Sequence, residues 1–305
     1  MPELQFPNVI DNSMRKGLVK CQKYAHWKFE RGLNDAGESE HLVAGGAFAK
    51  GIEATRRAYF ERGMSQDLAL IEGINAIHAS YKGYVPPAKS FKTADRVAGS
   101  LAYYLNANPF AEDEFVPLEM PDGKRMIEVS FNHEIPILHP VTGKRLTYCG
   151  RFDMLAISKK TGLVWVNDEK TTSRIGEAWS NQWALDSQMT GYVWGARKLL
   201  RQAGLELEVA GAIINGVAIM KYDYETVRYP TYRQDWEVQR WYVQMLKDVD
   251  GWIDAFKHQS HNQVLDHACA LYNAPCEYAR LCKSGNPERI LGSYEVRFWN
   301  PLERQ

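Results

Sequence analysis

Apolar residues in the first third of the chain recur every three or four positions, which is the spacing of amphipathic helices. The pattern predicts four helices, at residues 13–27, 41–60, 67–81 and 94–105. Ser13 is a candidate cap for the first helix, and Thr93 precedes the fourth. The fourth helix is expected to end before the Asn108-Pro109 pair, because a residue that precedes proline avoids the helical conformation.

From about residue 125 the pattern changes to runs of β-branched and aromatic residues, which are typical of strands. Three strands are predicted, at residues 126–138, 144–157 and 162–171. Turn-forming residues separate them at 140–143 and 158–162, so we expect the strands to be linked as hairpins.

The remainder alternates between helical and strand patterns and ends in an irregular tail. It predicts a helix from Trp183 to Ala203 stopped by Gly204, a buried strand within 207–221, an edge strand at 226–232 and a helix from Asp235 to Phe256. Together these elements predict an α/β fold with a central mixed sheet and flanking helices. We expect three regions, a helical one over 1–110, a core over 111–260 and a cysteine-containing tail over 261–305.

The composition is that of an ordinary globular chain of 305 residues, 45% of them hydrophobic, which allows a substantial core. Lys and Arg total 37, as do Asp and Glu, so any binding of nucleic acid must be local rather than driven by net charge. No apolar run is long enough to cross a membrane, and the N-terminus lacks the apolar core of a secretory signal. A cytoplasmic protein with no membrane association is therefore expected.

Charged side chains interrupt two neighbouring predicted strands. Asp153 lies in one strand, and Asp168 and Lys170 lie at the end of the next. Because side chains alternate along a strand, Asp168 and Lys170 share a face, to which the neighbouring strand can bring Asp153. Two carboxylates on one face of an apolar sheet repel each other unless a cation lies between them, and Mg²⁺ or Mn²⁺ is the expected cation. The alternative is that all three are solvated residues at strand ends.

An ammonium group beside such a cation has a chemical role of its own. It can orient a water molecule and stabilise the charge that develops on phosphorus during phosphodiester hydrolysis. Lys170 is therefore a candidate catalytic residue.

Gln188 and Tyr192 lie four residues apart on the following predicted helix, so both project from one face. Three motifs thus follow one another along the chain. They are G-x-x-D from Gly150 to Asp153, D-x-K-T from Asp168 to Thr171, and Q-x-x-x-Y from Gln188 to Tyr192.

This ordered set resembles the PD-(D/E)XK nucleases, in particular the RecB-like exonuclease branch, and the resemblance extends over most of the chain. It implies a restriction-endonuclease-like core. It also implies that Asp153 and Asp168 are metal ligands, that Lys170 is the catalytic lysine, and that Gln188 and Tyr192 line the substrate side of the site.

Members of this family often carry a further His or Glu on an early helix with the form G-x-x-F-H-x-x-x-E. Here Gly45 to Phe48 match, Ala49 stands at the His position, and Glu53 follows one turn later. Glu53 is therefore a candidate oxygen ligand, with a surface position on an amphipathic helix as the alternative. Glu128, in an earlier strand, is a further candidate metal ligand, and a solvent-facing strand position is its alternative.

Four of the five cysteines follow an order known from this family, with one before the core and three in the tail. They are Cys21, Cys269, Cys276 and Cys282. Related RecB-like nucleases, including CRISPR-associated exonucleases, hold a [4Fe-4S] cluster with cysteines in this order, so the resemblance implies such a cluster here. The tail spacing differs from the commoner C-x-x-C-x5-C form. Free thiols, or a zinc site completed by His261 or His267, are the alternatives. Cys149 is expected to be a small buried hydrophobic residue.

Hydroxyl and guanidinium groups follow the catalytic strand at Thr171, Thr172 and Arg174, where they can hold backbone phosphates without reading bases. Four aromatic residues are close in sequence and either stack on unpaired bases or pack in the core. They are Trp179, Trp183, Tyr192 and Trp194.

The sequence therefore predicts a magnesium-dependent DNA exonuclease that acts in recombination, repair or phage DNA metabolism. The resemblance implies DNA as partner, and a single-strand annealing protein as a possible second one. A non-catalytic nucleic-acid-binding module and an endonuclease of the same fold are the alternatives.

Overall fold

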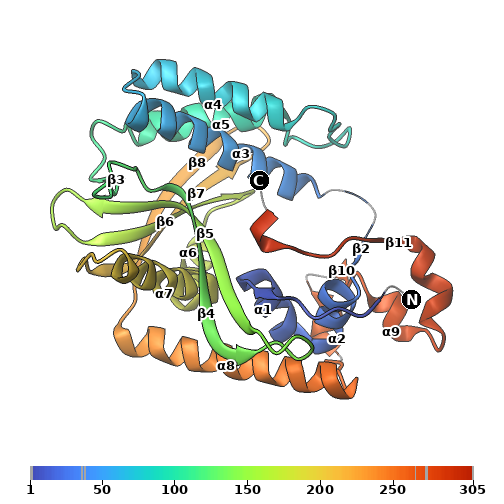
Figure 1. Cartoon of the computed structure of the whole chain (residues 1–305). Helices are drawn as coiled ribbons and strands as arrows, with labels where there is room; N and C mark the ends of the chain where they lie inside the picture. Colours follow the sequence, from blue (N-terminus) through green and yellow to red (C-terminus); the bar gives the residue numbers. More distant parts are fainter. Residues whose placement is uncertain (1–2, 36, 38, 265, 272–273, 304–305) are drawn as a thin grey trace. The chain divides into compact units, whose positions relative to one another are not determined.

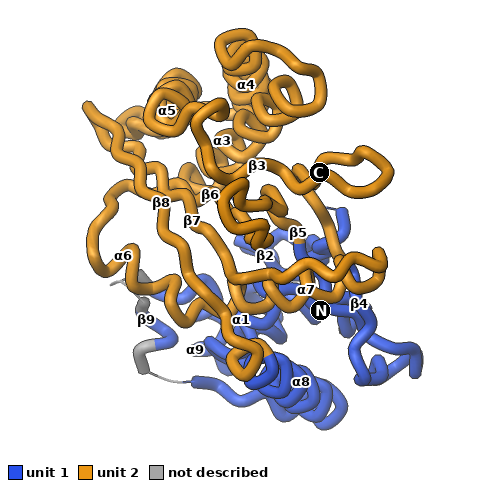
Figure 2. The backbone as a smooth tube through the Cα atoms, turned by 90° about the vertical axis from the view of Figure 1, so that its left-hand side faces the viewer, with its two compact units in different colours: residues 1–37, 132–150, 239–305 blue, residues 38–131, 151–238 orange. Residues whose placement is uncertain are grey.

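The computed structural model describes residues 3–35, 37, 39–264, 266–271 and 274–303. The chain divides into two compact units, each assembled from separate stretches (Figure 2). The first unit comprises residues 1–37, 132–150 and 239–305, and the second comprises residues 38–131 and 151–238. The sequence-based division near residues 110 and 260 stays a prediction.

The second unit is built on a mixed β-sheet (Figure 1). Its strands include β3 (Phe115–Pro117), the C-terminal part of β5 (Arg145–Ser158), β6 (Val164–Thr172), β7 (Val209–Ile219) and β8 (Tyr224–Tyr232). β5 pairs antiparallel with both β3 and β6, β6 pairs parallel with β7, and β7 pairs antiparallel with β8. The predicted α/β class with a central mixed sheet is thereby confirmed.

β7 lies between two partner strands, and all of its residues are buried. Burial on both faces explains its nearly continuous apolar sequence. Gly216 interrupts that sequence because the ring of Trp179 lies against it, and an added Cβ would come within 2.3 Å of the ring. β8 is mostly half-exposed and contains Pro230, as expected of an edge strand.

Helices cover both faces of this sheet (Figure 1). One face is covered by α3 (Glu40–Arg56) with the π-helical turn Arg57–Glu61, by α4 (Gln66–Ser80) and by α5 (Ala94–Ala107). The other face is covered by α7 (Ser187–Gln202). Two short elements precede α7, namely α6 (Glu177–Asn181) and the 3-10 turn Gln182–Leu185. Apolar side chains of α3, α4 and α5 form one core cluster with Val217 and Ile219 of β7. The two layers of helices thus enclose the sheet that carries Asp153, Asp168 and Lys170.

The first unit combines the two ends of the chain. Its N-terminal elements are β1 (Val9–Ile10), α1 (Asn12–Lys20), α2 (Gln22–Ala25), the π-helical turn His26–Glu30 and β2 (Leu33–Asp35), and it also holds parts of β4 (Ile127–Leu138), β5 and α8 (Asp235–His258). The tail contributes short elements. They are the 3-10 turns Asp266–Cys269, Pro287–Ser293 and Pro301–Glu303, the strands β9 (Ala270–Leu271), β10 (Ala274–Pro275) and β11 (Tyr294–Val296), and helix α9 (Ala279–Lys283).

The tail is tied to the N-terminal elements by pairing and by an apolar core. β11 pairs antiparallel with β2. Trp27 and Leu33 from the N-terminal elements pack with Tyr278 and Leu281 from the tail, and all four side chains are buried. Much of the tail that was expected to be irregular is therefore held by defined contacts.

Two predicted helix starts are wrong, because an aspartate provides the cap in each case. Asp11, rather than Ser13, accepts a hydrogen bond from the backbone N of Met14 and begins α1. Asp186 accepts from the backbone N atoms of Gln188 and Met189, so the helix predicted from Trp183 begins at Ser187. The first predicted helix is also divided, because the extended backbone of Cys21 separates α1 from α2.

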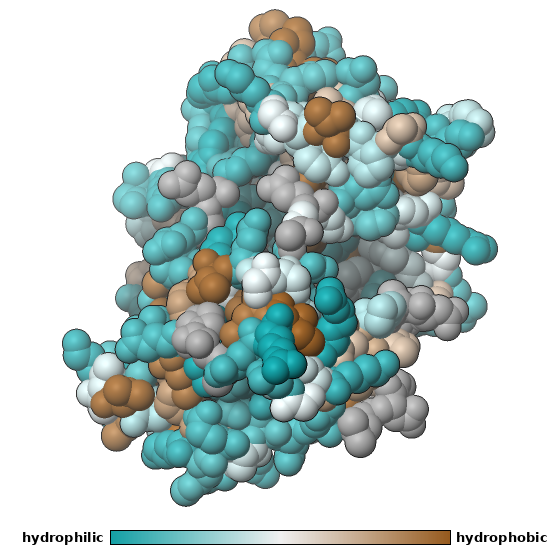
Figure 3. Space-filling view, turned by 90° about the vertical axis from the view of Figure 1, so that its right-hand side faces the viewer, coloured by the Kyte–Doolittle hydropathy of each residue, from teal (hydrophilic) through white to brown (hydrophobic). Residues whose placement is uncertain are grey.

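Hydrophilic residues dominate the face of the molecule shown in Figure 3, where hydrophobic residues occur in small groups. Such small groups are ordinary on protein surfaces. Within the described part of the chain, the helices fall short of the length and apolarity needed to cross a membrane.

Candidate active site

Asp153 and Asp168 lie next to each other where β5 and β6 stop pairing in the regular register. The two strands pair from Ile157↔Val164 to Met154↔Asn167, and the next residue on each strand is one of the two aspartates. Here a carboxylate oxygen of Asp153 accepts a hydrogen bond of 2.6 Å from the backbone N of Glu169. The side chain of Asp168 is buried, and that of Asp153 is half-buried. Burial and the proximity of Asp168 raise the pKa of Asp153 well above its ordinary range.

Lys170 lies on the same face of β6 as Asp168, as the strand alternation predicts. Its ammonium nitrogen forms an ion pair with Oδ2 of Asp168. Burial lowers the pKa of Lys170, but Asp168 and Asp153 outweigh it, so the pKa lies above its ordinary value. Burial raises the pKa of Asp168, which Lys170 partly offsets. The two acidic groups and the amine predicted to meet are thus in one electrostatic neighbourhood.

Glu169 points away from Lys170 into a buried network that the sequence did not reveal. Its two carboxylate oxygens bind the guanidinium of Arg56 on α3, one at 2.9 Å from Nη1 and the other in an ion pair with Nη2. Asn167 and Asn215 donate to the same carboxylate at 2.7 and 3.1 Å. Burial raises the pKa of Glu169, but Arg56 outweighs it and leaves the pKa below its ordinary value. A charged pair therefore fastens α3 to the strand that carries Asp168 and Lys170.

Gln188 and Tyr192 meet on one face of α7, as their spacing predicts. The side-chain amide of Gln188 donates a hydrogen bond of 2.9 Å to the hydroxyl oxygen of Tyr192. The ring of Tyr192 packs edge-on against Phe131 and Phe152. Burial, and then Asp168, raise the pKa of the Tyr192 hydroxyl. The phenol is therefore protonated at neutral pH and lies close to Asp168.

Glu128 is buried, so the alternative that it faces solvent is wrong. Its side chain is 8% exposed, and one carboxylate oxygen lies 3.0 Å from Nε of Arg151. Burial raises the pKa of Glu128 to about 7, Arg151 opposes this shift, and Glu53 adds to it. Asp153, Asp168 and Glu128 do not bring three ligand atoms within 4.8 Å of one another.

Glu53 lies on the side of α3 near Glu128, and its side chain is 22% exposed. Its carboxylate accepts a hydrogen bond of 3.0 Å from Nε of Arg57, which follows one turn later in the chain. It is therefore neither a freely solvated surface residue nor a carboxylate without a partner.

The expected phosphate-contacting residues have different surroundings. Thr171 is half-buried, and its hydroxyl lies 3.2 Å from where a Cβ of Gly45 would stand. Thr172 accepts from the backbone N of Arg174 over 3.4 Å, and Arg174 is exposed. A close approach of α3 to β6 is thus allowed by the first glycine of the early-helix motif.

Most of the nearby aromatic residues serve packing. Trp183 is 7% exposed, and its ring lies edge-on to Trp179 with centroids 5.3 Å apart. Tyr192 is buried to a similar degree, while Trp194 is half-buried.

The four cysteines singled out by the sequence line one small cavity in the first unit. They are Cys21, Cys269, Cys276 and Cys282. All are free thiols, as is the buried Cys149, which lies outside this set. Burial raises the pKa of Cys282, and the neighbouring Cys21 and Cys276 add to the shift. His261 does not line the cavity but points to Glu30. The side chain of His267 lies outside the described part of the structure.

Comparison with known proteins begins with two negative results. No family model matches the chain, and no curated protein does. A solved structure described as SSO0001 aligns with a TM-score of 0.30 at 16% sequence identity, and the alignment covers 80% of this chain and 78% of that chain. That TM-score is too low to show a shared fold.

Another solved structure shares the fold of this chain. It is described as a putative exonuclease from Eubacterium rectale and aligns with a TM-score of 0.56 at 13% sequence identity. The alignment covers 92% of this chain and 90% of that one. The chain therefore shares, over nearly its whole length, the fold of a protein described as an exonuclease.

Proposed function

We propose that the protein is a metal-dependent DNA exonuclease of the RecB-like type that hydrolyses phosphodiester bonds in recombination, repair or phage DNA metabolism. The observation that carries the proposal is the meeting of Asp153, Asp168 and Lys170 at the point where β5 and β6 diverge. The likeness of fold to a described exonuclease supports it independently.

The donor set suits a hard divalent cation. Asp153 and Asp168 offer carboxylate oxygens, and the pKa of each is raised. A cation between the two carboxylates would lower both pKa values. We assign Mg²⁺, or Mn²⁺ in its place, to these two ligands. Glu53 and Glu128 are proposed as further oxygen donors that act directly or through water, since they add negative charge on the α3 side. A cation held here supplies positive charge that favours deprotonation of water and offsets charge on the phosphate.

Lys170 acts as a positive charge rather than as a base. Its raised pKa keeps the amine protonated at neutral pH. The ammonium can therefore hold a water molecule in line with the phosphorus and stabilise the negative charge that grows on the phosphate oxygens.

The hydroxyl oxygen of Tyr192 accepts a hydrogen bond from the side-chain amide of Gln188. The phenolic O–H of Tyr192 is therefore available to donate a hydrogen bond to the substrate.

Contacts to the nucleic acid are assigned to backbone phosphates. Thr171, Thr172 and Arg174 follow directly on the strand of Lys170, and Arg174 is exposed. Contacts of this kind position a strand without reading its bases, so digestion without sequence preference is expected. A single-strand annealing protein remains a proposed partner.

The cysteine cavity is proposed to hold a [4Fe-4S] cluster with a structural role. Cys21, Cys269, Cys276 and Cys282 line it together, and no three of their sulfur atoms lie within 4.8 Å of one another. Four thiolates around a single zinc at 2.3 Å would lie about 3.8 Å apart. Thiolates are soft ligands, which suit the iron of such a cluster.

The activity is tested by incubating linear and covalently closed circular DNA with the protein, with and without Mg²⁺. The native chain should shorten linear DNA only with the metal, and Lys170→Ala should lower the rate by at least about a hundredfold, since a single electrostatic donor contributes about that much. Lys144→Ala, in the turn before β5, is the matched control and should behave like the native chain. Cleavage of closed circles would show an endonuclease instead, and equal activity of the native chain and Lys170→Ala would contradict an enzymatic role for this site.

A further inference from the structure

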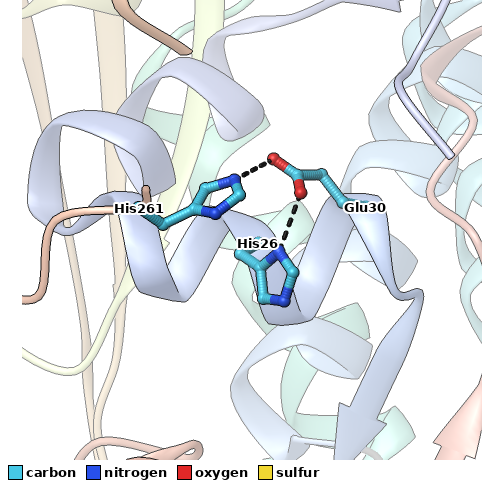
Figure 4. Close-up of side chains that lie close together, drawn as sticks. All are labelled: His26, Glu30 and His261. Carbon is cyan, nitrogen blue, oxygen red and sulfur yellow. Dashed lines mark hydrogen bonds and ion pairs between the residues drawn. The ribbon is translucent and has the colours of Figure 1, made fainter. Parts of the chain in front are cut away.

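Two histidines and a glutamate converge inside the first unit, apart from the cysteine cavity (Figure 4). His26 and Glu30 lie one turn apart on the π-helical turn that follows α2, and His261 comes from the segment after α8. One carboxylate oxygen of Glu30 lies 2.8 Å from Nδ1 of His26, and the other lies 2.7 Å from Nε2 of His261. The two imidazole rings are in contact, with centroids 4.4 Å apart.

All three side chains are withdrawn from water. Their exposed fractions are 5% for His26, 0% for Glu30 and 1% for His261. Burial raises the pKa of Glu30, but hydrogen bonds from the two histidines outweigh it and leave the pKa below its ordinary value. Burial lowers the pKa of His26. The group therefore offers one carboxylate and two imidazoles, all withdrawn from water, and these are ligand types that bind transition metals.

We propose that His26, Glu30 and His261 form a binding site for a transition-metal ion, with zinc as the ion that their chemistry suits best. Each residue offers one ligand atom, and these atoms all lie within 4.8 Å of one another. Among the described residues of this chain, no other group of three His, Cys, Asp or Glu side chains reaches this spacing.

The ligand spacing is close to what zinc needs. Zinc binds imidazole nitrogen and carboxylate oxygen at about 2.0 to 2.2 Å in tetrahedral geometry, which separates neighbouring ligand atoms by about 3.4 Å. The nitrogen to oxygen distances of 2.7 and 2.8 Å are those of hydrogen bonds. A bound zinc ion would therefore increase these two distances by about 0.6 to 0.7 Å. The protons now on Nδ1 of His26 and Nε2 of His261 would move to the opposite ring nitrogens.

Trp252 provides the outer contact that a metal-binding carboxylate usually has. Its indole N–H donates a hydrogen bond of 2.6 Å to Oε1 of Glu30, and Trp252 is itself fully buried. Such outer hydrogen bonds fix the orientation of ligating carboxylates and are a regular feature of metal sites. Because the indole can only donate, it holds Glu30 in place without competing for the ion.

The site differs in chemistry from the two other metal sites proposed for the protein. Imidazole nitrogens suit zinc, whereas the oxygen-only ligands of Asp153 and Asp168 suit magnesium. Zinc bound by thiolates has ligand distances of about 2.3 Å, and zinc bound by His and Glu has distances of about 2.0 to 2.2 Å, so X-ray absorption spectroscopy can separate this site from the cysteine cavity.

The test loads the purified full-length protein with zinc, removes loosely bound ion by dialysis, and measures zinc content together with the zinc absorption fine structure. The native protein should retain zinc with a nitrogen and oxygen shell at about 2.0 to 2.1 Å. His261→Gln and Glu30→Gln should each lose this shell, and Tm should rise on adding zinc to the native protein but not to either variant. Circular dichroism of the zinc-free forms checks that the variants are folded.

Trp252→Phe serves as the matched control, because it removes the outer hydrogen bond but no ligand and should keep the zinc shell with weaker affinity. Should either variant fail to fold, the native protein alone decides the matter, since a zinc shell made only of sulfur, or no retained zinc, overturns the proposal. Equal nitrogen and oxygen shells in the native protein and in folded His261→Gln would overturn it as well. In those cases the three residues form only a buried hydrogen-bonded cluster.

Discussion

At the scale of single residues, two features of Glu128 are unfavourable in free energy. Its φ of 52° is in the left-handed region, which non-glycine residues rarely adopt. Its carboxyl group is buried, with an elevated pKa. Residues held in such unfavourable states cost about 1 to 3 kcal/mol and cluster at functional sites. The position of Glu128 near Glu53 and Asp153 supports its proposed role as an oxygen donor.

Glu128 should make the metal-free protein less stable as the pH rises. Its pKa of about 7 in the folded protein exceeds the ordinary value of 4.5, so the folded state keeps a proton that the unfolded chain has already lost. The stabilising contribution is complete below the unfolded pKa and is lost as the pH rises through 7, with a total of about 3 kcal/mol at 1.36 kcal/mol per pKa unit.

Urea unfolding in the presence of a chelator, at about pH 5 and about pH 8, measures this loss. Glu128→Gln stays neutral at both pH values and should lack this part of the pH dependence. An identical pH dependence in the native protein and in Glu128→Gln would show that this carboxyl does not titrate as described.

At the scale of elements, the sequence predicted most helices and strands of the sheet-containing unit, but not the ion pair that links α3 to the sheet. Strand alternation was enough to place Asp168 and Lys170 on one face, and the four-residue spacing was enough to pair Gln188 with Tyr192. The pair of Arg56 with Glu169 could not be predicted, because it joins residues 113 positions apart. Charged residues on an amphipathic helix are also usually solvated, so the helical pattern does not indicate which of them is buried.

Replacing Arg56 should both destabilise the protein and reduce its activity. Arg56→Met keeps much of the side-chain length but leaves the buried carboxylate of Glu169 without its cation, which should cost about 3 to 5 kcal/mol of unfolding free energy. The strand with Asp168 and Lys170 would also lose its connection to α3. Urea unfolding and the nuclease assay measure the two effects.

Arg62→Met is the matched control for Arg56→Met. Arg62 forms an exposed ion pair with Glu72, and such pairs contribute about 0 to 1 kcal/mol. A cost for Arg56→Met no larger than that of the control would show that the buried pair does not hold α3 to the sheet.

At the scale of the whole molecule, each compact unit is assembled from segments far apart in sequence. Cys21 and the three tail cysteines meet in one cavity although more than half of the chain separates them. Family resemblance predicted this grouping, but periodicity could not, since local patterns carry no information on which distant segments meet. For the same reason, the meeting of His26 and Glu30 with His261 was not predicted.

Loss of one cavity cysteine should weaken the fold more than the chemistry. Cys282→Ala should remove the visible iron-sulfur absorption and lower the unfolding free energy by at least about 3 kcal/mol. This is the stabilisation that a ligand provides to the folded state when its concentration is about a hundred times its Kd. Nuclease activity per folded molecule should change little. Cys149→Ala, outside the cavity, is the control. If native protein purified without air lacks this absorption, the proposed iron-sulfur cluster is contradicted.

The proposed nuclease activity requires that Asp153 and Asp168 share one divalent cation. Manganese binding followed by electron paramagnetic resonance tests this directly, with native protein, Asp153→Asn, Asp168→Asn and, as control, Asp235→Asn, whose side chain is 98% exposed. We predict that each of the first two substitutions weakens binding by at least about tenfold, or 1.4 kcal/mol, and that the control does not. Manganese binding of native strength in both Asp153→Asn and Asp168→Asn would contradict the account.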